Sequence, residues 1–342
     1  MRKGKRLIAW IMAVVMLFTI CVFGGNGTAE AAATTPVAKH GRLSVKGADL
    51  VDSKGNKFQL RGISTHGINW DVGSPYVNKK AFKTLRDDWG VNAIRLAMYT
   101  EEYNGYCSGG SQAKLRKLVD KGVGYATDLG MYAIIDWHIL SDGNPNKNKS
   151  QAKKFFTTMA KKYKNNKNVI YEICNEPNGC GWKEIKSYAT DIIKTIRKYD
   201  KKAVIIVGTP TWSQLGTDGT SNEVADSPIK GYKNIMYSLH FYASEWAHNE
   251  YLPAKVAYAR KKKLPIIVSE FGLSPASGDG AINKASADKW MKLLNKYNIS
   301  YFCWSLSNKN ESASLLKPST KKTSGWKSGD LSTAGKYIKK KY

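Results

Sequence analysis

The chain has 342 residues, of which 42% are hydrophobic and 11% aromatic, so it can bury a large core and is not a disordered protein. It carries 54 Lys and Arg residues against 27 Asp and Glu residues, a formal net charge of +27. The lysines are scattered along the chain, which favours solvated helix faces over a nucleic-acid-binding surface. We therefore expect no nucleic-acid partner, while attraction to anionic wall or plant polymers stays open.

The first residues have the pattern of a secretory signal. Four basic residues among the first six precede an apolar run from Leu7 to Phe23, and Ala29-Glu30-Ala31 supplies a cleavage site of the A-x-A type. A membrane anchor is the alternative, but the run is short for a membrane span and leads into small residues. We expect residues 1–31 to be removed and the mature protein to be secreted, extracellular and free of the membrane.

Four cysteines follow this segment, too few for a disulfide scaffold and spaced wrongly for a zinc site. Cys174 and Cys303 lie in apolar runs, so we expect them to be buried thiols. Cys107 and Cys180 lie in Gly-rich loops, where a disulfide bridge is possible.

Alternating polar and apolar residues around Gly47 and Gly55 predict short strands and turns, and a regular series of elements follows. Eight short apolar runs have the length of strands. They are residues 58–64, 91–97, 131–137, 169–174, 203–208, 235–240, 265–270 and 299–305. Helical patterns lie between most of them and at the end of the chain, at residues 78–89, 111–129, 150–163, 183–199, 252–263, 284–297 and 332–342.

Near-continuous apolar strands that alternate with amphipathic helices predict a parallel sheet covered by helices. Eight such units in roughly 250 residues match a (β/α)8 TIM barrel better than an open doubly wound sheet. No Gly-rich phosphate-binding fingerprint follows the first strand, which also disfavours the open sheet. We predict an α/β protein with a single domain over residues 36–342, in which short N-terminal strands cap the barrel.

The active site of such a barrel forms at the carboxyl ends of its strands, so the polar and aromatic residues found there are candidates. Each one has an ordinary structural explanation, such as an ion pair for Arg95 or packing for Trp304. Structural roles do not explain the whole set, because burying several unpaired ionisable groups costs several kcal/mol each. The set comprises His66, Arg95, Tyr99, Asp136, Trp137, His138, Asn175, Glu176, Trp212, His240, Tyr242, Glu270 and Trp304.

Two glutamates in this set, Glu176 and Glu270, follow the fourth and seventh predicted strands. Glycoside hydrolysis requires one carboxyl as proton donor, a second as nucleophile and flat apolar platforms for sugar faces. The sequence has no H-E-x-x-H helix and reads "DWHI" at the third strand end, so we expect no metal site and no metallohydrolase. It has no G-x-S-x-G elbow, which disfavours an esterase.

Six segments in chain order resemble glycoside hydrolase family 5, also called cellulase family A, and especially its bacterial-type endo-β-1,4-glucanases. The likeness runs from about residue 36 to the C-terminus. The segments are "RLAMY" at 95–99, "DWH" at 136–138, "NEP" at 175–177, "HFY" at 240–242, "SEFG" at 269–272 and "WSLSNKNES" at 304–312.

The resemblance implies that Glu176 is the general acid/base and Glu270 the nucleophile of an endo-acting cellulase. It places Asn175 on the substrate 2-hydroxyl, Arg95 and Tyr242 beside the nucleophile, and His138 and His240 around the acid/base and the cleaved sugar. It assigns glycone subsites to His66, Tyr99, Trp212, Trp304, Lys309 and Glu311, and substrate binding to Ala276.

Physical reasoning agrees with the two glutamate roles. The permanent charge of Arg95 should keep Glu270 ionised, while apolar rings and a second carboxylate should raise the pKa of Glu176 and keep its proton in place. Retaining hydrolysis by double displacement then requires carboxyl groups roughly 5 Å apart.

The substrate expected from the resemblance is a β-1,4-glucan. We also expect that the enzyme needs no cofactor and is a monomer. No carbohydrate-binding module is recognisable, so strong action on crystalline cellulose is not expected. Two alternatives stay open: the same machinery acting on mannan, mixed-linkage glucan or xyloglucan, and a non-catalytic glycan-binding barrel.

Overall fold

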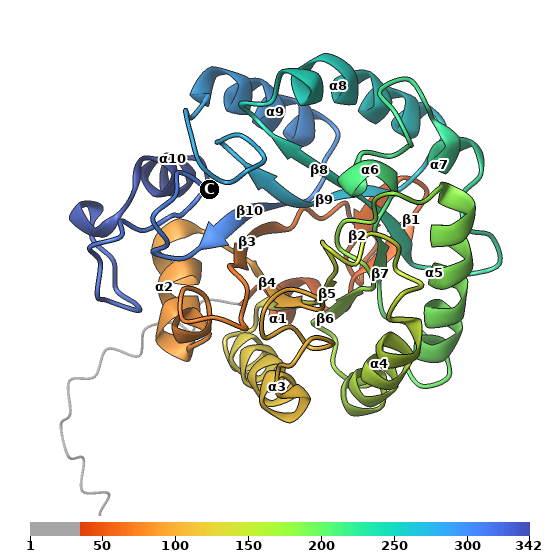
Figure 1. Ribbon diagram of the computed structural model, residues 1–342, viewed down its shortest axis with the longest axis horizontal. Coiled ribbons are helices and arrows are strands. Elements are labelled where there is room, and N and C mark those ends of the chain that lie inside the picture. The colour runs from red at the N-terminus through yellow and green to blue at the C-terminus, as the bar shows by residue number, and fades with distance from the viewer. Residues whose placement is uncertain (1–34) are drawn as a thin grey trace, which may run out of the picture. The chain divides into compact units, whose positions relative to one another are not determined.

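The computed structural model describes residues 35–342, and the predicted signal peptide lies outside this part of the chain. Eight parallel strands form a closed barrel in the order β10-β3-β4-β5-β6-β7-β8-β9 (Figure 1). The barrel strands are β3 (Arg61–Thr65), β4 (Ala93–Tyr99), β5 (Tyr132–His138), β6 (Val169–Glu172), β7 (Ile205–Val207), β8 (Ile235–Tyr242), β9 (Ile266–Gly272) and β10 (Tyr301–Leu306). Each coincides with one predicted run, so the (β/α)8 barrel is confirmed.

Helices connect successive strands and cover the outside of the barrel (Figure 1). The longer ones are α2 (Lys79–Trp89), α3 (Gln112–Asp128), α4 (Lys149–Tyr163), α5 (Trp182–Arg197), α8 (Trp246–Lys261), α9 (Lys284–Lys296) and α10 (Thr333–Lys341). Short helical turns are α1 (Pro36–His40), η1 (Ser74–Tyr76), α6 (Pro210–Ser213), α7 (Glu223–Asp226) and η2 (Ser328–Asp330). Only α6 and α7 lie between β7 and β8, in agreement with the missing helical pattern there.

The N-terminal hairpin closes one end of the barrel, as predicted. It pairs β1 (Ser44–Lys46) with β2 (Asp49–Val51) in antiparallel register. Leu43 and Leu50 belong to the same buried cluster as side chains from the barrel interior, among them Ala93 and Tyr132 near the beginnings of their strands. The hairpin therefore seals the end of the barrel that lies away from the carboxyl ends of the strands.

A polar layer lies above this apolar cluster inside the barrel. Successive strand residues point to opposite faces, so the residue two positions after an inward one is inward again. Ala93, Ile134 and Ile170 belong to the apolar interior. Two positions later on the same three strands the chain carries ionisable side chains, namely Arg95, Asp136 and Glu172.

Helix α8 begins earlier than the sequence predicts. The helical pattern in the sequence covers residues 252–263. The helix instead begins at Trp246 and holds Pro253 inside it. The additional turns bring residues of this segment to the end of the barrel where β8 finishes.

The four cysteines at positions 107, 174, 180 and 303 are free thiols. Cys174 and Cys303 are buried, as expected from their apolar surroundings. The bridge considered between Cys107 and Cys180 is not formed. Among the described residues, no helix is long and apolar enough to cross a membrane.

Candidate active site

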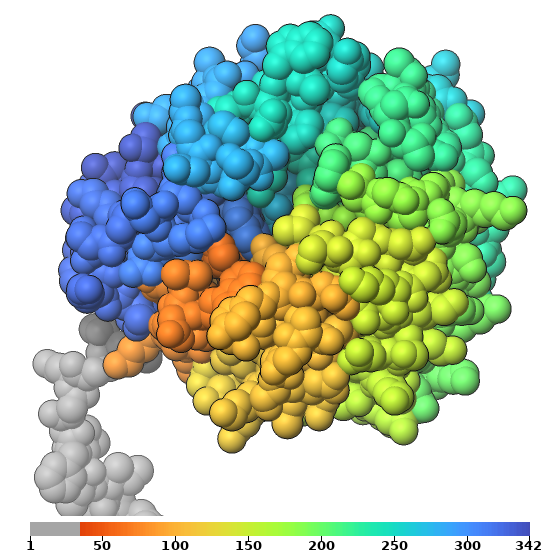
Figure 2. All heavy atoms as spheres, in the orientation of Figure 1, coloured from red at the N-terminus to blue at the C-terminus, as the bar shows by residue number. Residues whose placement is uncertain are grey.

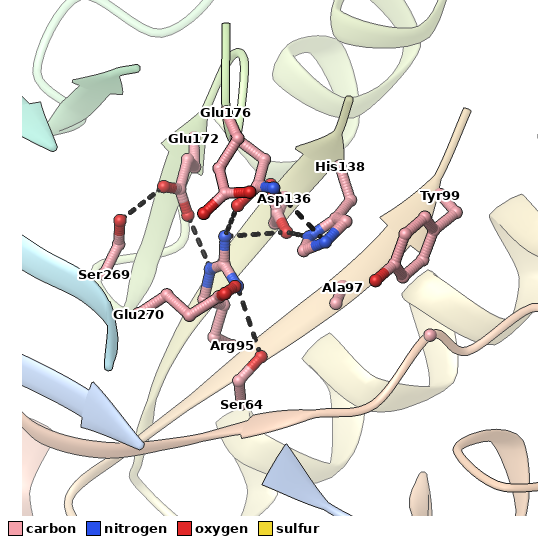
Figure 3. A network of polar contacts seen from close by, with 12 residues as sticks. Ser64, Arg95, Ala97, Tyr99, Asp136, His138, Glu172, Glu176, Ser269 and Glu270 are labelled. Atoms are coloured by element: carbon pink, nitrogen blue, oxygen red, sulfur yellow. Dashed lines mark hydrogen bonds and ion pairs between the residues drawn. The ribbon is translucent and has the colours of Figure 1, made fainter. Parts of the chain in front are cut away.

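Arg95 lies at the centre of the polar layer and is fully buried (Figure 3). Its Nε donates to Glu172 Oε2 at 2.7 Å, and its Nη1 donates to Glu270 Oε2 at 2.9 Å. Its Nη2 donates to Asn175 Oδ1 at 2.5 Å and lies 3.1 Å from Asp136 Oδ2. Burial disfavours the guanidinium charge, but the surrounding carboxylates outweigh it and raise the pKa of Arg95 well above its ordinary value. Arg95 therefore remains a cation that orients carboxyl groups from three other strands or strand ends.

Glu270, on β9, is held by two donors. Besides Arg95, the Tyr242 hydroxyl donates to Glu270 Oε1 at 2.8 Å. Both bonds fix the orientation of its carboxyl group. Glu270 therefore presents a fixed carboxyl group to the pocket, as a nucleophile would require.

Glu176 occupies a different environment across the same site. Its carboxyl oxygen Oε1 lies 2.7 Å from His240 Nδ1, and its side chain is 12% exposed. Burial raises the pKa of Glu176 to about 8; the Arg95 charge lowers it, while Asp136 and Glu172 raise it further. Glu176 therefore keeps its proton at neutral pH and can act as an acid.

The hydrogen bonds around His240 assign its proton to Nε2. The Ser269 hydroxyl donates to Glu172 Oε1 at 2.5 Å, so Ser269 must accept from His240 Nε2, which lies 3.0 Å away. Burial also lowers the pKa of His240 to about 4, so the ring is neutral. A neutral ring protonated at Nε2 has an acceptor at Nδ1, which matches a protonated Glu176 as the donor.

His138 is oriented in a similar way by Asp136 and Asn175. Its Nδ1 lies 2.6 Å from Asp136 Oδ2, and its Nε2 lies 3.2 Å from Asn175 Nδ2. Asn175 Nδ2 also donates to the Ile139 carbonyl at 3.1 Å. Burial lowers the pKa of His138 to about 3, and burial raises the pKa of Asp136 to about 7. The ring is therefore a neutral group in a fixed orientation.

A pocket of about 450 Å³ opens above this layer, at the carboxyl ends of the strands. Figure 2 shows the hollow at the centre of this face, between early, middle and late segments of the chain. Twelve of the predicted site residues line the pocket: His66, Tyr99, His138, Glu176, Trp212, His240, Tyr242, Glu270, Ala276, Trp304, Lys309 and Glu311. Three of the remaining candidates, Arg95, Asp136 and Asn175, are fully buried in the layer below the pocket, where Arg95 contacts the other two. The fourth, Trp137, does not belong to the site, because its ring packs on Tyr106 and Phe155 in the core.

One side of the pocket is built around Trp304 on β10. Its ring stacks on His138 with centroids 5.2 Å apart and an interplanar angle of 19°, and it lies 5.2 Å from His66. Glu311 pairs with Lys309 Nζ at 2.5 Å, and its other oxygen lies 3.7 Å from His66 Nε2. These contacts hold a flat ring and polar groups in fixed positions on the pocket wall.

Trp212 follows β7, which lies opposite β3 in the order of the closed barrel. His66 follows β3, so a chain that crosses the pocket would meet His66 and Trp212 on opposite sides of its centre. The assignment of Trp212 to the glycone subsites remains a prediction.

The sequence prediction missed several residues of the site. Glu172 and Ser269 complete the hydrogen-bond network below the pocket, and Gln214 and His248 line it. Glu172 had a recognisable signal, because it is a carboxylate within an apolar strand, whereas Ser269 resembles any strand serine. His248 belongs to the part of α8 that precedes the predicted helix.

Glu176, His240 and Glu270 also place one possible ligand atom each within 4.8 Å of one another. Two carboxylates and an imidazole can in principle hold a divalent cation. In this site, however, Arg95 and Tyr242 already bind Glu270, and the proton of Glu176 would have to leave. The absence of a functional metal remains a prediction.

A barrel in which two carboxyl groups from different strand ends face each other among aromatic rings defines a glycosidase. Residues 51–310 match the family model described as Cellulase (glycosyl hydrolase family 5). The chain belongs to glycosyl hydrolase family 5.

Curated relatives and solved structures agree with this assignment. An endoglucanase of Clostridium saccharobutylicum is 47% identical over 98% of this chain and 72% of its own length. Endoglucanase A of Butyrivibrio fibrisolvens is 45% identical over 87% of this chain and 68% of its own length. The endoglucanase catalytic domain of Thermobifida fusca in complex with cellotetraose is 37% identical, with a TM-score of 0.83 over 90% of this chain and 99% of that one.

Proposed function

We propose that the protein is a secreted endo-β-1,4-glucanase that cleaves cellulose or related β-glucans with retention of anomeric configuration. The observation that carries the proposal is the approach of Glu176 and Glu270, whose nearest oxygens lie within 4.8 Å in one pocket. Retaining glycosidases hold their carboxyl groups about 5 to 5.5 Å apart, whereas inverting enzymes leave about 6.5 to 9.5 Å for a water molecule.

In the proposed mechanism, Glu270 attacks the anomeric carbon while Glu176 donates its proton to the departing glycosidic oxygen. This step forms a covalent glycosyl-enzyme. Glu176, now ionised, takes a proton from a water molecule that attacks the same carbon and releases Glu270. Arg95 and Tyr242 hold the nucleophile, and His240 Nδ1 accepts a hydrogen bond from the protonated form of Glu176.

The β-1,4-glucan substrate is supported by the names of the relatives and by the aromatic lining of the pocket. Initial rates on carboxymethyl-cellulose, galactomannan, mixed-linkage glucan and xyloglucan, measured side by side, test it. We expect carboxymethyl-cellulose to be cleaved faster than galactomannan or xyloglucan, and a clear preference for mannan would replace the proposed substrate with another β-glycan.

The mechanism is tested by the first product and by Glu270→Gln. NMR of the product formed at once should show the β-anomer, and an α-anomer would contradict retention. Glu270→Gln should reduce turnover by about 10³-fold or more while oligosaccharide binding persists. Full turnover in this variant would remove Glu270 from its role, and binding without turnover in the wild type would indicate a non-catalytic barrel.

We further propose that the enzyme is extracellular and monomeric, acts without a cofactor and binds no nucleic acid. The amino-terminal signal pattern supports secretion. Sequencing the N-terminus of protein recovered from the culture medium should give a start after Ala31, and light scattering should give the mass of one chain.

A further inference from the structure

Large apolar side chains are exposed mainly on the face of the barrel that holds the pocket. Among the described residues, the exposed ones are Tyr103, Trp212, Trp246 and Tyr251. Tyr103 follows β4, Trp212 follows β7, and the other two follow β8, so all four lie after the carboxyl end of a barrel strand. Exposed aromatic rings collected on one face are typical of a binding surface.

Trp246 and Tyr251 form a pair at the beginning of α8. Trp246 is 68% exposed and Tyr251 38% exposed, with ring centroids 5.9 Å apart and planes at 81°. The exposed Trp246 ring contributes little to folding stability, because most of it stays in water, whereas Tyr251 is more than half buried and supports it from the side. The pair is available for a ligand that offers a flat apolar face.

The first turns of α8 are attached to the wall of the pocket. Glu245 accepts a hydrogen bond from the backbone N–H of Ala276 at 2.7 Å, and Ala276 lines the pocket. His248 also lines the pocket, and its Nδ1 accepts from the Tyr242 backbone N–H at 2.9 Å. Trp246 lies between Glu245 and His248 in the chain, so its backbone lies beside the pocket wall, and its side chain is exposed there.

A second set of contacts joins the pair to the loop that carries Trp212. A Cβ atom on Gly219 would lie 2.9 Å from the Tyr251 ring, so this loop packs directly on the ring. Lys255 Nζ donates to the carbonyl of Gln214 at 3.1 Å and also to the carbonyl of Asp218. Gln214 lines the pocket together with Trp212. The pair therefore continues the pocket wall on the Trp212 side.

We propose that Trp246 and Tyr251 form an outlying sugar-binding subsite for a β-glucan chain that extends from the pocket past Trp212. The faces of β-linked glucosyl units carry C–H groups, and their edges carry hydroxyl groups. A ring with an exposed apolar face at the border of a polar pocket is complementary to such a unit. The inference rests on the proposed function, because its ligand is the same polysaccharide.

Chain-length dependence of the rate tests the subsite. Trp246→Ala should lower kcat/KM for cellohexaose and soluble polymer by about tenfold and leave an aryl β-cellobioside unchanged, because the short substrate does not extend beyond the pocket. Trp246→Phe, the matched control, keeps a flat ring and should retain most of the activity on long chains. Trp246→Leu keeps apolar bulk without the flat ring and should resemble Trp246→Ala.

Calorimetry with the Glu270→Gln variant supplies a readout that does not depend on turnover. Adding Trp246→Ala should weaken cellohexaose binding by about tenfold and leave cellobiose binding unchanged. Equal changes for long and short ligands, or no change for either, would overturn the subsite while the wild type still cleaves β-glucan. A surface for a protein partner predicts the second of these results. A wild type inactive on every β-glucan would overturn both the subsite and the proposed function.

Discussion

The Ser269 hydroxyl donates to Glu172 and thereby decides which nitrogen of His240 carries a proton. Ser269 Oγ donates its hydrogen to Glu172 Oε1, 2.5 Å away, so toward His240 Nε2 it can act only as an acceptor. The opposite nitrogen of the neutral ring then favours the protonated form of Glu176. A residue that contacts neither Glu176 nor the pocket surface thus supports the acid in its protonated state.

Ser269→Ala tests this arrangement. Without an acceptor for Nε2, His240 can move its proton to Nδ1, which favours an ionised Glu176. We expect kcat/KM to fall by about tenfold at neutral pH and the alkaline limb of the pH profile to move to lower pH. Ser269→Thr retains the hydroxyl and should return the alkaline limb to the pH of the wild type. An alkaline limb at the same pH in the alanine variant and the wild type would contradict the assignment of the His240 proton to Nε2.

The alkaline limb itself should report Glu176. Its pKa is raised to about 8 by burial, and the protonated form is the active one. Activity is therefore expected below this value and should be lost as the pH rises through it. The measurement is kcat/KM against pH with an aryl β-cellobioside. Glu176→Gln, assayed on a substrate with a good leaving group, should retain some activity and lack this limb; an unchanged limb would assign it to another group.

Glu176 should also reduce the stability of the folded protein at neutral pH. Its pKa is raised from the ordinary value of about 4.5 to about 8 on folding, so the folded state binds more protons than the unfolded state between these values. Stability contributed by this group is present below about pH 4.5 and decreases as the pH rises toward 8. At pH 7, Glu176→Gln should raise the free energy of unfolding by about 1 to 3 kcal/mol.

Denaturant unfolding of both proteins at pH 5 and pH 7 measures this difference. The stabilisation should be small at pH 5 and larger at pH 7. A stabilisation that does not depend on pH would indicate that the substitution acts through packing.

Arg95→Lys should be severe despite the retained charge. The guanidinium reaches Glu172, Glu270 and Asn175 through three different nitrogens, and a single ammonium cannot span these positions. We expect kcat to fall by about 100-fold and the free energy of unfolding by about 3 kcal/mol, because buried carboxylates lose their partner.

Arg260→Lys provides a matched control for Arg95→Lys. Arg260 lies in the last turn of α8 and binds Asp49 at 2.7 Å, beside the N-terminal hairpin. Its replacement should leave kcat unchanged. Comparable losses of kcat in both variants would show that Arg95 acts through general stability alone.

Much of the fold followed from the sequence alone because local physics determines it. Apolar strands and amphipathic helices can bury their apolar faces only by packing against each other in layers, and eight such units close a barrel. All parallel strands in a barrel end at one face, so the chain positions of Glu176 and Glu270 already implied that they meet there. The predicted residues other than Trp137 line or underlie one pocket for this reason.

The tertiary structure alone decided which side chains bind each other across the barrel. The partners of Arg95 depend on strand register, and β8 and β9 shift register between Ser238 and His240. A shift of this kind changes which residues face each other and leaves no signature in composition or periodicity. Ser269 is therefore recognisable as a partner of His240 only in three dimensions.

The position of Trp246 was decided in the same way. A local rule places Pro253 near a helix start, but packing of the first turns of α8 against the pocket wall outweighs that preference. Sequence patterns report what each segment prefers by itself, whereas contacts between distant segments determine the proton on His240 and the exposure of Trp246.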